Sequence, residues 1–306
     1  MADEPPAWQF ELSGEAVRRG PSRSAVRRVL SEIGTLIALG WALGAVAVIA
    51  GSAGAQGPPA TLLAAHRGGS LLWPENSLLA FRNAVALGVD FIEFDVHLSK
   101  DGEVVVIHDP TLDRTTTGAG PVMDRTVAEL KALRLKDRTG AATEETVPTL
   151  DEVVAVAVQG RRRILLEIKV DPSRARYPGI EEKVLTILDR HGMAGSTVVM
   201  AFEAPTWRRV RELRADVATC ALYSARMLGR TTLAAELDTL RSAGVRFIGV
   251  EHVAVDAAAV TQARAAGIEL GAWTVNDPAA MKRLIDAGPA ILITDQPDVA
   301  KTVLGR

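Results

Sequence analysis

The sequence predicts an α/β protein built on a closed (β/α)8 barrel, with a hydrophobic segment before it. Three observations lead to this prediction. The length of 306 residues suits one barrel plus an extra segment, 48% of the residues are apolar, and apolar runs alternate with helical patterns after residue 59. Continuous apolar strands that alternate with helices indicate a parallel sheet covered by helices. The formal net charge of −2 gives no basic field that would attract nucleic acid, so no nucleic-acid partner is expected.

The N-terminal sixty residues differ from the rest of the chain. Residues 1–32 form a polar, basic region with five arginines, whereas residues 33–55 contain no charged side chain. A helix that spans a bilayer needs about 20 apolar residues, and arginines before such a segment keep the N-terminus in the cytoplasm. We therefore expect residues 33–55 to be either a signal peptide cleaved after the A-x-A sequence at 53–55 or an uncleaved transmembrane helix.

Both interpretations place the barrel outside the cytoplasm, either exported or anchored to the membrane. Two alternatives remain for this segment: a twin-arginine signal at Arg27 and Arg28, which the surrounding residues match only in part, and a buried helix of a soluble protein. The second alternative fits less well because no polar stripe runs through the segment.

The remaining residues, 60–306, contain the candidate strands of the barrel. These apolar runs are residues 61–65, 90–96, 104–107, 164–168, 197–201, 217–222, 246–250, 268–273 and 291–294. If 104–107 is a local hairpin partner of 90–96, eight principal strands remain, as the barrel requires. A doubly wound open sheet is the alternative, but no G-x-G-x-x-G sequence follows the first strand.

Helical patterns lie between most of these runs. They include residues 76–88, 124–133, 149–157 and 277–288. Asn76 or Ser77 is the expected cap at the start of the first of these helices. Asp277 is the expected N-cap of the last one, and Gly288 its expected end.

Three acidic residues occur where the sequence predicts buried strands. Glu93 and Asp95 are two residues apart and therefore face the same side of their strand, and Glu167 lies near the end of another apolar strand. Buried carboxylates are costly and repel one another, and a divalent cation would relieve both penalties. Oxygen ligands favour Mg²⁺ or Ca²⁺ over Zn²⁺. The alternative is a salt-bridge network with Arg67 and Lys169.

Other polar residues follow the predicted strands at the end where barrel enzymes hold their catalytic groups. His66 and His108 are candidates for acid–base catalysis, although either alone could be structural. Arg67 is a natural clamp for phosphate because its planar fork matches two phosphate oxygens. Trp273 closes its strand and could pack in the core or form an apolar wall for a substrate. The other three histidines, His97, His191 and His252, are expected to be structural.

At these residues the sequence resembles the glycerophosphodiester phosphodiesterase family. The matching stretches are HRGGSLLWPENSLLAFRNAVALGVDFIEFDVHLSKDGEVVVIHDPTLDRTTTG (66–118), LLEIK (165–169), WTVND (273–277) and LITDQP (292–297). The resemblance runs from about residue 61 to the C-terminus and leaves the N-terminal 60 residues outside. It implies a TIM barrel that hydrolyses a glycerophosphodiester to glycerol 3-phosphate and an alcohol.

The resemblance also implies roles for individual residues. At matching positions, a divalent metal would be held by Glu93, Asp95 and Glu167. His66 and His108 look like the acid–base pair, Arg67 and Lys169 like phosphate contacts, and Trp273 like a glycerol-side contact. Which histidine is the acid, and whether the nucleophile is water or the neighbouring glycerol hydroxyl, stays open.

Three other functions compete with this interpretation. One is a lysophospholipase D or sphingomyelinase D type of activity on lipids, which membrane delivery would favour. Another is a non-catalytic exported binding protein, although every proposed acid, base and clamp is present. The third is a glycosidase that uses Glu93 and Glu167, which leaves Asp95, both candidate histidines and Arg67 without a role. A small-molecule substrate is the expected partner, and the membrane is a possible one through residues 33–55.

Overall fold

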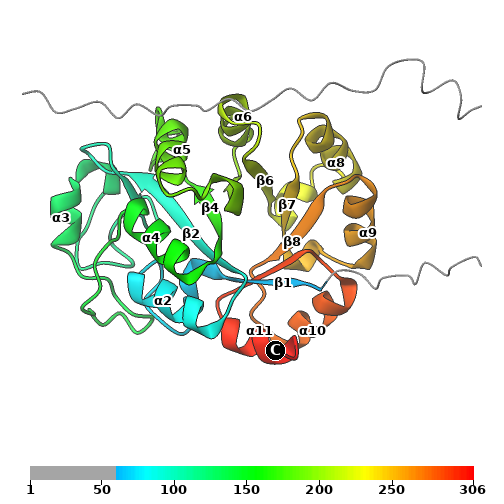
Figure 1. Ribbon diagram of the computed structural model, residues 1–306, viewed down its shortest axis with the longest axis horizontal. Coiled ribbons are helices and arrows are strands. Elements are labelled where there is room, and N and C mark those ends of the chain that lie inside the picture. The colour runs from blue at the N-terminus through cyan, green and yellow to red at the C-terminus, as the bar shows by residue number, and fades with distance from the viewer. Residues whose placement is uncertain (1–59) are drawn as a thin grey trace, which may run out of the picture. The chain divides into compact units, whose positions relative to one another are not determined.

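The strands pair in an order that closes a barrel. The computed structural model describes residues 60–306, and within them nine strands form one sheet in the order β1-β9-β8-β7-β6-β5-β4-β2-β3, with β1 also paired to β2 (Figure 1). The strands are β1 (Leu62–Ala65), β2 (Phe91–Leu98), β3 (Val104–Val106), β4 (Arg163–Ile168), β5 (Thr197–Ala201), β6 (Ala218–Tyr223), β7 (Phe247–Glu251), β8 (Glu269–Trp273) and β9 (Ile291–Thr294).

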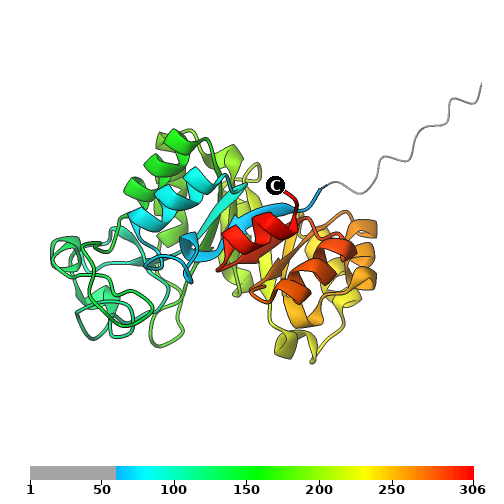
Figure 2. The ribbon, with the colours of Figure 1, turned by 90° about the horizontal axis from the view of Figure 1, so that it is seen from below.

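The pairing confirms the predicted barrel and excludes the doubly wound open sheet. Strand β1 pairs in parallel with β2 on one side and with β9 on the other, so the two ends of the sheet meet. Figure 2 shows the blue first strand beside the red C-terminal part of the chain. Strand β3 pairs antiparallel to β2, with Val96 opposite Val106. It is therefore the predicted hairpin partner, and eight parallel strands make up the barrel.

Helices follow most of the barrel strands and lie around their outside (Figure 1). They are α2 (Leu78–Leu87), α3 (Val127–Lys131), α4 (Leu150–Gly160), α5 (Ile180–Arg190), α6 (Ala204–Leu213), α7 (Ala225–Leu228), α8 (Leu233–Ser242), α9 (Ala257–Ala265), α10 (Pro278–Ala287) and α11 (Pro297–Val303).

The helix ends follow the capping residues. Ser77, and not Asn76, is the N-cap of α2, because its hydroxyl accepts a hydrogen bond from the backbone N–H of Ala80. Asp277 caps α10 as predicted, and Gly288 ends that helix in the left-handed conformation. Helix α3 is shorter than the predicted 124–133, because a capping box at Thr126 fixes its start.

Side chains of the strands alternate between two cores. Phe91, Leu165, Met200 and Ile293 point inward and pack in the interior of the barrel. The alternate positions of the strands point outward and pack against the helices; Phe94 of β2 is at such a position and lies in edge contact with Phe81 of α2. On β2 the inward set continues from Phe91 to positions 93 and 95, so both acidic side chains of this strand face the interior.

An irregular segment lies between β3 and α4. Residues 107–149 contain one short 3-10 turn and helix α3, and extend to one side of the barrel in Figure 2. A small apolar cluster of its own holds this segment together, with Leu112, Val122 and Leu135 fully or almost fully buried. The segment supplies residues at the mouth of the barrel.

The predicted polar region 1–32 and the predicted signal or transmembrane segment 33–55 lie outside the described residues. Within residues 60–306, no helix has both the length and the apolar character needed to cross a bilayer.

Candidate active site

Three buried carboxylates meet inside the C-terminal end of the barrel. Strands β2 and β4 are paired so that Asp95 lies beside Glu167, and Glu93 precedes Asp95 on the same face. One oxygen atom from each of the three side chains lies within 4.8 Å of the other two. The structure thus brings the three predicted metal ligands together, although they come from strands separated by some 70 residues of chain.

Two basic side chains reach these carboxylates. Lys169 Nζ donates a hydrogen bond to Glu167 Oε1 at 2.7 Å and forms an ion pair with Asp95 Oδ1 at 3.1 Å. Arg67 Nε lies 3.6 Å from Asp95 Oδ2. The predicted salt-bridge alternative is therefore present in part, but two permanent cations face three carboxylates. Within the described residues, the basic side chain near Glu93 is His66, with its Nε2 4.0 Å from Glu93 Oε2.

The excess negative charge falls mainly on Glu93. Burial raises the pKa of Glu93 to about 7, and the neighbouring carboxylates add to this increase. Burial also raises the pKa of Glu167. Burial opposes the charge of Asp95 as well, but Lys169 and the other basic neighbours outweigh it and lower the pKa of Asp95. Two of the three carboxyl groups, Glu93 and Glu167, are thus disfavoured as anions unless a further cation is present.

This donor set fits a hard divalent cation. All ligand atoms are carboxylate oxygens, and Lys169 is the cation that reaches both Asp95 and Glu167. Mg²⁺ and Ca²⁺ bind such oxygen sets, whereas Zn²⁺ favours sites with nitrogen or sulfur ligands. A divalent ion here would compensate the charge that Lys169 and Arg67 leave uncompensated.

His66 follows β1 and is held by the carboxylate of Asp295, the residue directly after the last strand, β9. Its Nδ1 lies 2.6 Å from Asp295 Oδ1, and the same oxygen accepts a hydrogen bond from the Ser70 hydroxyl. Burial opposes a charge on His66, but the Glu93 carboxylate and the hydrogen bond to Asp295 outweigh it and raise the pKa of His66. With Nδ1 engaged, Nε2 is the ring nitrogen left for chemistry.

His108 follows β3 and has a carboxylate partner of its own. Its Nδ1 lies 2.7 Å from Asp109 Oδ1. Its backbone carbonyl lies 3.0 Å from Nε2 of buried His97, and His97 Nδ1 lies 2.9 Å from the Tyr177 hydroxyl. Burial lowers the pKa of His108, and the nearby cations Lys169 and Arg67 oppose its protonation further. His97 is fully buried, and its hydrogen bonds hold the backbone of His108 in place.

A tight turn positions Arg67. Arg67 and the two following glycines all have positive φ, and a Cβ atom added to Gly68 would lie 2.7 Å from the Cβ of Ala80. Only glycine fits there without movement of α2, which explains the HRGG sequence. The turn also lets the backbone N–H of Arg67 donate to Glu93 Oε2 at 2.7 Å.

A second arginine ties the mouth of the barrel together. Arg114, from the irregular segment 107–149, donates hydrogen bonds to both carboxylate oxygens of Glu75 and of Asp109. Glu75 also accepts from Arg67 Nη1 at 3.2 Å. Burial opposes the charge of Asp109, but its hydrogen bonds to Arg114 and His108 lower its pKa to about 2. The network therefore links the Arg67 turn to the partner of His108.

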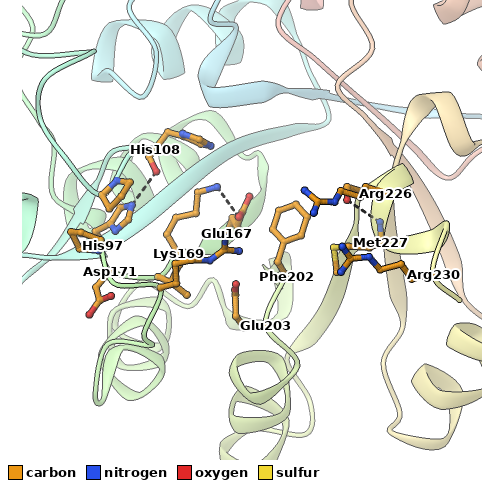
Figure 3. A pocket seen from close by; sticks show the side chains of 15 residues that line it. His97, His108, Glu167, Lys169, Asp171, Phe202, Glu203, Arg226, Met227 and Arg230 are labelled. Carbon is orange, nitrogen blue, oxygen red and sulfur yellow. Dashed lines mark hydrogen bonds and ion pairs between the residues drawn. The ribbon is translucent and has the colours of Figure 1, made fainter.

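The site opens into two cavities that share lining residues, and Figure 3 shows the outer one. The inner cavity, of about 150 Å³, is lined by both histidines, Arg67, Lys169 and Trp273. The outer cavity, of about 730 Å³, shares His108 and Lys169 with the inner one but not His66. Trp273 packs edge-on against Phe202, and its indole Nε1 is buried with no hydrogen-bond partner among residues 60–306.

The sequence places Asp109 beside His108 at the end of the run 104–107, but it indicated neither Asp295 as the partner of His66 nor the contact of Asn76 with Asp95. Asp295 lies two residues after inward-facing Ile293, so the period of two that located Glu93 and Asp95 would also have located it. Asn76, predicted as a possible cap, instead adopts positive φ and donates a hydrogen bond to Asp95 Oδ2 at 3.1 Å. The Arg114–Glu75 pair gave no signal in the sequence, because it joins two irregular segments.

Comparisons with known proteins agree on one family. The model of the "Glycerophosphoryl diester phosphodiesterase family" matches residues 66–299. A glycerophosphodiester phosphodiesterase of Caldanaerobacter subterraneus is 34% identical over 239 residues, which are 78% of this chain and 95% of that protein. One of Bacillus subtilis is 33% identical over 257 residues, 79% of this chain and 86% of that protein.

A solved structure shares the fold and was determined with a ligand. The structure of an Oleispira antarctica phosphodiesterase in complex with the product sn-glycerol-3-phosphate is 26% identical to this chain. The two superpose with a TM-score of 0.69, and the match covers 81% of this chain and 98% of the other.

Proposed function

The chain belongs to the glycerophosphoryl diester phosphodiesterase family, and on that premise we propose how its site hydrolyses a glycerophosphodiester to glycerol 3-phosphate and an alcohol. The observation that supports the proposal is the inner cavity. Its wall combines two carboxylate-bound histidines, an arginine, a lysine and two of the three clustered carboxylates, Glu93 and Glu167. This combination can bind an anion, activate a nucleophile and protonate a leaving group in one place.

Glu93, Asp95 and Glu167 would hold a divalent ion, Mg²⁺ or Ca²⁺, which when bound would offset negative charge on the phosphate oxygens. Arg67 and Lys169 lie beside the same carboxylates and line the inner cavity, so their N–H groups can donate to phosphate oxygens. Because the transition state of hydrolysis gains negative charge on oxygen, these donors stabilise it more than they stabilise the substrate.

The positions of the two histidines divide the proton transfers between them. His66 lines only the inner cavity, whereas His108 lines both cavities. The small inner cavity suits the glycerol half of the substrate and the large outer one suits the alcohol. We therefore propose that His66 takes a proton from the nucleophile, which is water or the neighbouring glycerol hydroxyl, and that His108 gives one to the leaving oxygen.

The pKa directions alone would suggest the reverse assignment. The pKa of His66 is raised in part by the Glu93 carboxylate, and a cation bound to Glu93 would oppose that effect. The locations of the rings do not depend on the ion, so the assignment rests on them. Asp295 and Asp109 occupy Nδ1 of His66 and His108 respectively, which leaves Nε2 of each ring for proton transfer.

Trp273 would recognise the glycerol half. Its indole N–H is buried at the wall of the inner cavity and has no partner there among the described residues, so a glycerol hydroxyl can accept its hydrogen bond. The edge-on contact with Phe202 holds the indole ring in place. The outer cavity is lined by charged side chains together with apolar ones such as Phe202 and Met227, so the choice between a polar alcohol and a lipid is left to the turnover test.

We also propose that the barrel works on the non-cytoplasmic side of a membrane. The basic region 1–32 before the hydrophobic segment 33–55 supports this placement. Either a cleaved or an uncleaved segment would give the same location of the site.

Hydrolysis by the purified full chain tests the function, measured as release of glycerol 3-phosphate from the glycerophosphodiesters and as release of choline from lysophosphatidylcholine. The substrates are glycerophosphocholine, glycerophosphoethanolamine, glycerophosphoglycerol and lysophosphatidylcholine, each with Mg²⁺, with Ca²⁺ and with excess chelator. We expect turnover of the glycerophosphodiesters that requires a divalent ion. Full activity in chelator would contradict the metal site, and turnover of lysophosphatidylcholine alone would favour a lysophospholipase D.

A further inference from the structure

The outer cavity is larger than a small alcohol requires. At about 730 Å³ it has several times the volume of the inner cavity, and it extends from Lys169 along the segment after β4 and the segment after β6 (Figure 3). It joins the inner cavity at His108, Glu167, Lys169 and Phe202. Since the proposed function places the leaving alcohol on the His108 side, this cavity is where the alcohol lies.

Three arginines line the far part of this cavity. Arg174 comes from the turn after β4, Arg226 from the short helix α7 and Arg230 from the residues that follow α7. Within residues 60–306 none of the three guanidinium groups forms an ion pair with a carboxylate. Elsewhere on the surface arginines are commonly paired; Arg209 and Arg214 each contact two carboxylates. The three cavity arginines are therefore available to a ligand.

The carboxylates in the same wall offset only part of this charge, because three arginines face two acidic side chains, Asp171 and Glu203. Asp171 Oδ1 accepts three hydrogen bonds, two from Ser173 and one from the backbone of Ala175, all within its own turn. Glu203 is the other acidic side chain beside the arginines. In Figure 3, Arg226 and Arg230 lie across the cavity from Lys169, with Phe202 between them. A ligand that spans the cavity from the reacting phosphate thus meets a second cationic region.

We propose that the outer cavity is a second anion subsite, and that the preferred substrates are glycerophosphodiesters whose alcohol carries a further phosphate group. The inference rests on the proposed function, because it assumes that the alcohol leaves from the His108 side. Guanidinium groups bind phosphate through paired N–H donors, whereas they gain nothing from a neutral or cationic alcohol such as glycerol or choline. Each arginine is exposed and contributes modestly, so the effect depends on the group acting together.

Two substrates that differ by one phosphodiester test this subsite. Glycerophosphoglycerol has a neutral leaving group, and bis(glycerophospho)glycerol has the same linkage with a second phosphodiester attached. The second substrate has two equivalent linkages that can be cleaved, so its kcat/KM is divided by two before the comparison. For the full chain at low salt, we expect this corrected kcat/KM to be at least about tenfold higher than that of glycerophosphoglycerol. The advantage should shrink in 0.5 M NaCl, because salt screens exposed charges.

The double variant Arg226→Gln, Arg230→Gln should reduce this advantage to less than about threefold and leave turnover of glycerophosphocholine within about twofold. The matched control is Arg82→Gln, Arg125→Gln, which removes two exposed arginines that line neither cavity. It should keep the full advantage. Thermal melts of both variants verify folding.

The results of these assays distinguish a failure of the second anion subsite from a failure of the proposed hydrolytic function. Equal kcat/KM on the two substrates, or an advantage that survives in the arginine double variant, overturns the second anion subsite while turnover of glycerophosphocholine still supports the proposed function. If no glycerophosphodiester is hydrolysed at all, the proposed function fails and the subsite fails with it.

Discussion

Replacing Asp295 with asparagine removes the charge that orients His66. Asp295 lies 2.6 Å from His66 Nδ1 through Oδ1 and accepts a hydrogen bond from Asn276 Nδ2 at 2.6 Å through Oδ2. Burial opposes its charge, but these bonds and that from Ser70 lower its pKa to about 2, so it is ionised throughout the working range. An asparagine has one acceptor oxygen where three donors converge, and its amide group would face one of them.

The expected loss follows from the kind of hydrogen bond that is removed. A hydrogen bond to a charged group contributes about 1.5–3 kcal/mol, and every 1.4 kcal/mol is a factor of about ten in rate. We therefore expect kcat/KM to fall by about 10- to 10²-fold. Because the Asp295 carboxylate raises the pKa of His66, the His66 ring in the variant should have a lower pKa. If His66 acts as the base, the acidic limb of the pH–rate profile moves to lower pH, since the ring stays deprotonated there.

The assay is the pH dependence of kcat/KM on glycerophosphocholine for the wild-type chain and for Asp295→Asn. Asp286→Asn on α10 is the matched control, because its exposed carboxylate forms an ion pair with exposed Lys282, far from the histidines in sequence and lining neither cavity. The control should behave like wild type. An unchanged profile and an unchanged rate in Asp295→Asn would show that this carboxylate does not position the catalytic ring.

Three further predictions concern the ion, the core and the membrane topology. The affinity for Mg²⁺ or Ca²⁺ should weaken as pH falls below about 7, by up to about tenfold per pH unit. The reason is that burial raises the pKa of Glu93 to about 7, so a proton competes with the ion for this carboxylate. Calorimetry at pH 6 and pH 8 measures the affinity, and equal values at the two pH values would contradict the prediction. Phe94→Ala should lower the free energy of unfolding by about 3–5 kcal/mol, because the ring is fully buried against Phe81, and urea denaturation with a loss below about 1 kcal/mol would refute the packing. A topology reporter fused after Arg306 should be active only outside the cytoplasm, and cytoplasmic activity would exclude export by residues 33–55.

The sequence predicted those parts of the fold that depend on short-range patterns. Apolar runs and the helical pattern between them depend on local periodicity, and for that reason the barrel and the antiparallel partner of β2 could be predicted. The period of two placed Glu93 and Asp95 on one face in the same way. Asp277 and Gly288 marked their helix because capping depends on residues within one turn.

Long-range partners could not be predicted in this way. Asp295 and His66 are separated by 229 positions, and no local rule relates them until the closure of the barrel brings β9 beside β1. Arg114 and Glu75 meet because residues 107–149 fold back over the mouth of the barrel, and an irregular segment has no periodicity to reveal such a contact. The carboxylate partner of His66 therefore emerges only from the structure, whereas Asp109, the partner of His108, is its neighbour in the sequence.

The division of proton transfer between His66 and His108 is tested most directly by changing the leaving group. Glycerophospho-p-nitrophenol releases a phenolate that needs little protonation, whereas glycerophosphocholine releases an alkoxide that must be protonated. On glycerophosphocholine, both His66→Ala and His108→Ala should lose at least about 10²-fold in turnover while remaining folded. On the nitrophenyl substrate, His108→Ala should recover most of that loss and His66→Ala should not. Near-native turnover of glycerophosphocholine by both folded variants would show that the histidines are structural, and recovery by His66→Ala alone would reverse their roles.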